Sequence, residues 1–179
     1  SYSIVTLYGA KSILPTTMQH LVTNQIIWYM AGFILAYLVM TVGNTYIYRI
    51  STFLYIFGIV MLVGLFFFGT SINDARCWYE IKGIGTIQPS EFMKIILIIV
   101  NASMISKFNE EFPNPSVKEE FMFLIKIGFV VLLPSILTFL QPDTGVVLIY
   151  LLITFIMLFI SGIRYRWFVL IFGILFLFV

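Results

Sequence analysis

Residues 88–106 read QPSEFMKIILIIVNASMIS, an apolar run close to the length of a membrane span that carries one Glu and one Lys. The rest of the chain is similar: its 179 residues are 61% hydrophobic and only 10% charged, with a mean hydropathy of +1.06. A soluble domain of this size is about 45–50% apolar and about 25% charged. The composition therefore excludes a soluble fold and predicts helices surrounded by lipid.

Five apolar stretches qualify, or nearly qualify, as membrane spans. They cover approximately residues 24–42, 50–69, 90–106, 121–140 and 144–160, and a further apolar run covers residues 167–179. Short connections predict antiparallel neighbours in a bundle. We therefore expect one all-α, polytopic transmembrane domain over residues 1–179, with partial helices at both ends, as a fragment of a longer protein.

Basic residues divide unequally between two alternating sets of loops, which predicts an orientation. The first set holds Arg49, Lys107, Lys118, Arg164 and Arg166, and the second holds Lys11, Arg76 and Lys82. Because positively charged loops remain in the cytoplasm, we expect loop 107–120 to be cytoplasmic and loop 70–89 to be outside. The outer loop is long enough to fold over the mouth of a cavity. The basic residues are scattered singly, so no nucleic-acid partner is predicted.

Two of the expected spans begin with a similar sequence motif. Residues 88–91 read QPSE and residues 141–145 read QPDTG. Proline ends the preceding extended segment, and Ser90 or Asp143 can act as an N-cap, so helix capping alone would explain both motifs. Alternatively, two helix N-termini at one membrane face would offer N–H groups and partial positive charge to a phosphate.

The span 90–106 also carries a polar stripe. At helical spacing, Ser90, Lys94 and Asn101 lie within about 40° of one another, and Glu91 widens the stripe to about 100°. Ionisable residues inside a span are costly and usually face a cavity or a partner. Glu91 and Lys94 are spaced i,i+3 and could also neutralise each other. A cavity-lining role and a structural ion pair both remain open.

Signatures of other chemistry are absent from the sequence. It contains no Walker, GxSxG or HExxH motif. Cys77 has no metal-ligand companions, so no metal cluster is predicted. As the single cysteine, it also excludes a disulfide framework within the chain.

The motifs, taken in order, resemble the RodA/FtsW/SpoVE (SEDS) family of cell-wall polymerases. ARCW at residues 75–78 precedes IQPSEFMKI at residues 87–95 and LQPDTG at residues 140–145. Family members have about ten transmembrane helices and carry a G-A-x-R-W loop, then Q-P-S-E-x-x-K and Q-P-D-x-G helix starts. The resemblance, closest to RodA, covers nearly the whole chain. The sequence departs from the family pattern at Asp74, where Gly is usual, and at Cys77, where Arg is usual. Arg76 lies one position before the usual place of that arginine.

The resemblance implies a peptidoglycan glycosyltransferase of the bacterial cytoplasmic membrane. It would polymerise lipid II, an undecaprenyl-pyrophosphate-linked disaccharide pentapeptide, during cell elongation. The family's catalytic Asp lies in a large outer loop after the seventh helix, so no catalytic residue is expected within this chain. The chain would instead form part of the substrate cavity. The predicted cavity residues are Gln88, Ser90, Glu91, Lys94, Asn101, Asp143, Arg76 and Trp78.

The resemblance also implies companions for the complete enzyme. A divalent cation, Mg or Mn, could assist the pyrophosphate leaving group. The expected partners are a class B penicillin-binding transpeptidase and proteins of the elongation complex. Three alternatives stay open from the sequence: a flippase or transporter of a lipid-linked precursor, a division-type polymerase resembling FtsW, and a scaffold subunit that only activates a partner.

Overall fold

The structure, a computed structural model, describes residues 26–27, 29–30, 32–34, 37, 41, 44–72, 75–81 and 85–170. The chain divides into two compact units, Ser1–Tyr46 and Ile47–Val179, which are considered separately. In the first unit, the described residues between 26 and 41 are helical, and they fall within the expected span 24–42. The remainder of that span, and residues 171–179 of the span 167–179, lie outside the described residues.

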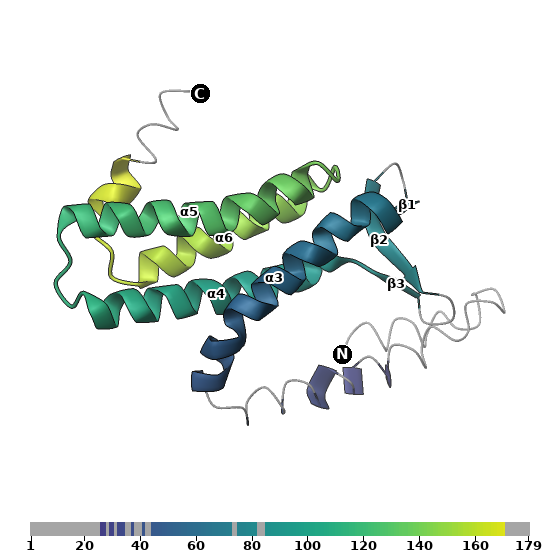
Figure 1. The fold of residues 1–179 in the computed structure, drawn as a ribbon, viewed down its shortest axis with the longest axis horizontal. Helices are drawn as coiled ribbons and strands as arrows, with labels where there is room; N and C mark the ends of the chain where they lie inside the picture. The colour runs from purple at the N-terminus through teal and green to yellow at the C-terminus, as the bar shows by residue number, and fades with distance from the viewer. Residues whose placement is uncertain are drawn as a thin grey trace, which may run out of the picture. The chain divides into compact units, whose positions relative to one another are not determined.

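Four helices make up most of the described chain: α3 (Asn44–Phe68), α4 (Pro89–Glu111), α5 (Val117–Phe139) and α6 (Thr144–Ile160). Helices α4, α5 and α6 run alongside one another and contact each other pairwise, while α3 crosses α4 (Figure 1). Gly58 permits this crossing, because a Cβ at that position would lie 2.7 Å from the sulfur of Met93.

The helices have the apolar character that a lipid environment requires. Tyr46–Phe68 of α3 and Val117–Phe139 of α5 are long and apolar enough to cross a membrane, and α6 is apolar but has 17 residues. Large apolar side chains such as Phe53, Phe67 and Phe129 are exposed on these helices. In water such a surface would be strongly unfavourable, whereas in lipid it is the expected one.

Two helix boundaries differ from the expected spans for identifiable reasons. Helix α4 continues to Glu111, beyond the span 90–106, and then stops because Pro113 disfavours a helical conformation in the residue before it. Helix α5 begins at Val117 because Ser116 and Glu119 form a capping box, in which the Ser116 N–H donates to Glu119 Oε2 at 2.6 Å. The loop expected over residues 107–120 is therefore reduced to residues 112–116.

The expected outer loop contains a small antiparallel sheet that the sequence analysis did not predict. Its strands are β1 (Thr70–Ile72), β2 (Ala75–Ile81) and β3 (Gly85–Ile87), in the order β1-β2-β3. The sheet is anchored on α3, because the hydroxyl of Tyr79 in β2 donates to the carbonyl of Met61 at 2.9 Å.

A hydrogen bond between α3 and α5 explains how α5 accommodates an internal proline. Pro134 has no N–H, so the carbonyl of Val130 loses its helical donor. The hydroxyl of Tyr55 in α3 donates to that carbonyl at 2.9 Å. This contact satisfies a backbone group that lipid could not satisfy, and it ties α3 to α5.

Candidate functional site

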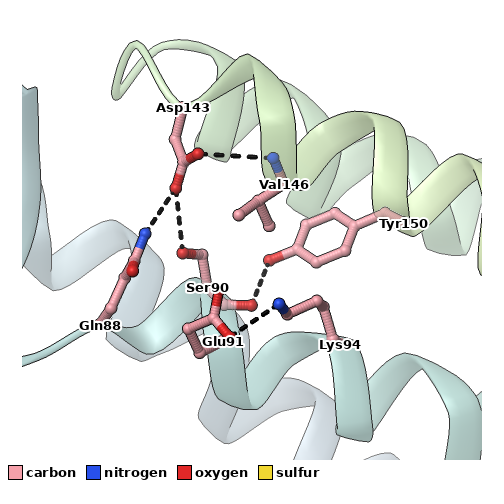
Figure 2. A network of polar contacts seen from close by, with 7 residues as sticks. All are labelled: Gln88, Ser90, Glu91, Lys94, Asp143, Val146 and Tyr150. Atoms are coloured by element: carbon pink, nitrogen blue, oxygen red, sulfur yellow. Dashed lines mark hydrogen bonds and ion pairs between the residues drawn. The ribbon is translucent and has the colours of Figure 1, made fainter. Parts of the chain in front are cut away.

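The starts of α4 and α6 meet at the carboxylate of Asp143 (Figure 2). Its Oδ2 accepts a hydrogen bond from Gln88 Nε2 at 2.6 Å and one from Ser90 Oγ at 3.3 Å. Its Oδ1 accepts from the Val146 N–H at 3.4 Å. One side chain therefore caps α6 and also joins it to α4, although the two helix starts are far apart in the sequence.

These contacts show which residues stand at the two helix starts. The prediction that Asp143 is an N-cap is confirmed, whereas the prediction for Ser90 is wrong. Gln88 occupies the N-cap position of α4, and Pro89 takes the first turn, so the Ser90 hydroxyl is free to reach Asp143. Because a carboxylate already occupies the N-terminus of α6, that terminus is not an open phosphate site.

Below Asp143, a chain of buried hydrogen bonds fastens the polar stripe of α4 to α6. The Tyr150 hydroxyl donates to the Ser90 carbonyl at 2.9 Å. Deeper in the bundle, Asn101 Nδ2 donates to Thr154 Oγ1 at 3.0 Å, and that hydroxyl donates to the Tyr150 carbonyl at 2.9 Å. Such bonds hold membrane helices together. Ser90 and Asn101 are therefore packed between helices.

The other two residues of the stripe form an ion pair at the edge of this network. Lys94 Nζ lies 2.7 Å from Glu91 Oε2, and the side chains are 21% and 51% exposed, respectively. The structural pair anticipated from the i,i+3 spacing is present. The Glu91 carboxylate is therefore the more accessible of the two groups, and the ammonium of Lys94 is partly covered.

Strand β2 carries the motif residues of the outer loop. Trp78 is half-buried, and alternation along the strand turns it away from the face that presents Cys77 and Tyr79. The side chain of Arg76, like all of Asp74 and Lys82, lies outside the described residues.

The departure at Cys77 has a structural context. Its sulfur lies 3.7 Å from the carbonyl of Gln141. Burial raises the pKa of the thiol, and the negative charge of Asp143 raises it further. Position 77 therefore holds a neutral group that is buried against the α5–α6 turn.

The sequence analysis missed two polar residues of this region. Gln141 is buried, and its Nε2 donates to the Leu62 carbonyl at 2.8 Å, which ties the α5–α6 turn to α3. Because Gln141 is the first residue of the QPDTG motif, that motif could have identified it as a candidate. Tyr150 stands in an apolar run, but it lies two turns after Asp143 on the same side of α6, and this spacing could have identified it.

The described residues offer no set of ligands for the divalent cation that the resemblance implies. Within the described ranges, no three His, Cys, Asp or Glu side chains are grouped so that they could hold a metal ion. Both Asp143 oxygens already accept hydrogen bonds. The chemistry that these residues can supply is a cation at Lys94, a carboxylate at Glu91 and a fixed hydrogen-bonded frame around Asp143.

Comparison with known proteins identifies relatives along the whole chain. The profile of the FtsW/RodA/SpoVE family of cell cycle proteins matches residues 1–179. The peptidoglycan glycosyltransferase MrdB of Helicobacter pylori is 33% identical over 144 residues, which are 80% of this chain and 37% of that protein. A probable peptidoglycan glycosyltransferase FtsW of Lactococcus lactis is 36% identical over 104 residues, covering 54% of this chain and 25% of that protein.

Solved structures show the same fold. RodA of Thermus thermophilus superposes with a TM-score of 0.69 at 23% identity, covering all of this chain and 59% of that one. A chain of a peptidoglycan synthase complex that coordinates polymerization and crosslinking superposes with a TM-score of 0.72 at 22% identity, covering 99% of this chain and 52% of that one. The expected polytopic helix bundle is thereby confirmed. The chain spans about a quarter to two fifths of the length of the curated relatives it matches.

Proposed function

The chain belongs to the FtsW/RodA/SpoVE (SEDS) family of cell cycle proteins, and on that premise we propose that the complete protein is a peptidoglycan glycosyltransferase that polymerises lipid II. The names of its relatives support the reaction class, since both the MrdB and the FtsW relatives are described as peptidoglycan glycosyltransferases. The resemblance to RodA in the sequence favours the elongation-type enzyme over the division type.

One observation supports a substrate site in this part of the chain. The Asp143 network joins the starts of α4 and α6, and the Glu91–Lys94 pair lies beside them on the first turns of α4 (Figure 2). A pyrophosphate leaving group requires positive charge where negative charge develops in the transition state. Lys94 supplies such a charge, and Glu91 holds its ammonium group in place.

The roles of the neighbouring residues follow from their contacts. Asp143, Gln88 and Ser90 are positioning residues, because their hydrogen bonds keep α4 and α6 in register. Asn101 extends the same interface towards the centre of the bundle. A role for Trp78 rests on the resemblance alone, since its side chain lies on the face of β2 opposite Cys77. We propose that the base that activates the acceptor hydroxyl is an Asp in the large outer loop after the seventh helix of the complete enzyme.

The proposal includes a setting for the reaction. Membership of the family supports a location in the bacterial cytoplasmic membrane. The excess of basic residues in one set of loops supports an orientation in which the sheet faces outward. A class B penicillin-binding transpeptidase is the proposed partner, since the similar synthase complex couples polymerization to crosslinking; elongation-complex proteins would join it. A divalent cation would need ligands from outside the described residues, and no step is assigned to it.

The test uses the protein from the complete gene, purified with its transpeptidase partner and supplied with fluorescent lipid II. We expect Glu91→Gln and Lys94→Gln to reduce glycan strand formation by about tenfold or more, the scale of a lost charge contact in a transition state. Glu110→Gln is the matched control, since Glu110 is an exposed carboxylate near the other end of α4. It should polymerise like the wild type.

Three results would overturn the proposal. Normal polymerisation by both Glu91→Gln and Lys94→Gln would remove these residues from the site. Transfer of labelled lipid across vesicle membranes without glycan formation would identify a transporter. Stimulation of the partner without any polymerase activity of the complex's membrane subunit would identify a scaffold.

A further inference from the structure

A pocket lies at the opposite end of α4 from the Asp143 network. It has a volume of about 280 Å³ and is formed by the last turns of α4 and the first turns of α5. Its floor is apolar and consists of Met104, Phe108, Met122 and Phe123. The Phe108 and Phe123 rings stack with centroids 4.1 Å apart, so the floor is firmly packed.

Four charged side chains form the rim of this pocket: Lys107, Glu111, Glu119 and Lys126. Across the part of the chain that the structure describes, neither lysine takes part in an ion pair. The rim thus offers two positive and two negative charges that sum to zero. Glu119 also accepts the Ser116 N–H in the capping box, which holds its carboxylate in place.

The rim lies where a membrane boundary is expected. Lys107 follows Glu91 by sixteen positions on one continuous helix, so the two residues are about 24 Å apart along its axis. The hydrocarbon core of a bilayer is about 30 Å thick. If Glu91 lies at one face, Lys107 and Lys126 are therefore close to the other, where long cationic side chains extend towards lipid headgroups.

From this arrangement we infer that the pocket binds a zwitterionic phospholipid whose headgroup carries a primary ammonium. The phosphodiester accepts hydrogen bonds from Lys107 and Lys126, and the ammonium donates to Glu111. An acyl chain lies over the apolar floor between α4 and α5. The site is distinct from the proposed substrate site, because it lies at the other end of the bundle, in the cytoplasmic leaflet by the orientation proposed above.

Other lipid headgroups match the rim less well. An anionic headgroup without an ammonium would leave Glu111 and Glu119 facing negative charge alone. A choline headgroup has no N–H to donate to a carboxylate, and it is best held by open aromatic faces. Here Phe108 stacks on Phe123, so those two faces are directed at each other.

The experiment measures which lipids the protein from the complete gene retains. The protein is purified in detergent and equilibrated with equal amounts of palmitoyl-oleoyl phosphatidylethanolamine, phosphatidylglycerol and phosphatidylcholine, and bound lipids are counted by native mass spectrometry. We expect preferential retention of phosphatidylethanolamine. The double variant Lys107→Gln/Lys126→Gln should retain it about tenfold less, as expected when two charge-assisted hydrogen bonds are lost.

Matched variants make the result specific. Lys118→Gln removes an exposed lysine of α5 that does not line the pocket, and it should retain lipid like the wild type. Glu111→Gln changes an exposed side chain, so folding is undisturbed; it should lower the ratio of phosphatidylethanolamine to phosphatidylglycerol. Equal losses in the double variant and in Lys118→Gln, or an unchanged ratio in Glu111→Gln, would each refute the assignment.

Discussion

Replacing Tyr55 by Phe tests the contact that lets α5 contain a proline. The Tyr55 hydroxyl donates at 2.9 Å to the carbonyl of Val130, the group whose helical donor Pro134 lacks. The substitution removes one oxygen and leaves the ring in place. The Val130 carbonyl is then without the donor that the Tyr55 hydroxyl supplied.

The expected magnitude follows from the chemistry of that bond. A neutral hydrogen bond contributes about 0.5–1.5 kcal/mol, and within membrane bundles the measured average is about 0.6 kcal/mol with a maximum near 1.7. We expect Tyr55→Phe to lower the free energy of unfolding by about 1 kcal/mol. Pro134→Ala supplies a backbone N–H to the same carbonyl, so in that background Tyr55→Phe should cost almost nothing.

The assay is a double-mutant cycle on the protein from the complete gene. Reversible unfolding of the wild type, both single variants and the double variant gives a coupling energy, which we expect to be about 1 kcal/mol. Tyr46→Phe, at an exposed position of α3, is the control and should have no effect. An equal cost of Tyr55→Phe in both backgrounds would show that the hydroxyl does not replace the missing donor.

Three further predictions concern the sheet and the helix ends. Burial raises the pKa of the Cys77 thiol, so the fraction of thiolate is low at neutral pH. Alkylation of Cys77, followed by mass spectrometry, should therefore be slow at neutral pH. The rate of alkylation should rise at a higher pH than it does for a free cysteine. If alkylation of Cys77 accelerated at the same pH as that of a free cysteine, the burial of the thiol would be contradicted. A Cβ at Gly64 would collide with the Tyr79 hydroxyl, so Gly64→Ala should lower the free energy of unfolding by about 1 kcal/mol. Gly128 has open space around it, so Gly128→Ala should not lower the free energy of unfolding. Equal effects of the two substitutions would contradict the contact between Gly64 and Tyr79. Ser116→Ala removes the capping box and should cost about 1 kcal/mol in the same unfolding assay, and a neutral result would mean that the α5 start is held by packing alone.

Some features of the fold could be predicted because they depend on local composition. The apolar run that starts at Thr144 has the length of its helix, and α6 covers the expected residues 144–160. The extent of α4 could not be read from apolarity, because its last turn is polar and its end is decided by Pro113. The sheet at residues 70–87 was missed, since its short strands depend on pairing with each other and on the anchor between Tyr79 and α3.

Some features of the candidate site could also be predicted from the sequence, and others could not. The i,i+3 spacing of Glu91 and Lys94 made an ion pair one of two open interpretations, and the structure contains that pair because a helix brings such neighbours together. The motif order was sufficient for the family, which the match over residues 1–179 confirms. The proposed roles of these residues in substrate binding stay predictions.

The sequence by itself determined the lipid environment, the helical class and the family, since each of these depends on composition or on spacing within a single segment. Only the tertiary structure decided what Asp143 does. Its carboxylate could have bound a ligand or capped a helix, and it caps α6 while accepting hydrogen bonds from Gln88 and Ser90. These partners lie more than fifty residues earlier, and only the packing of α4 against α6 brings them within hydrogen-bonding distance.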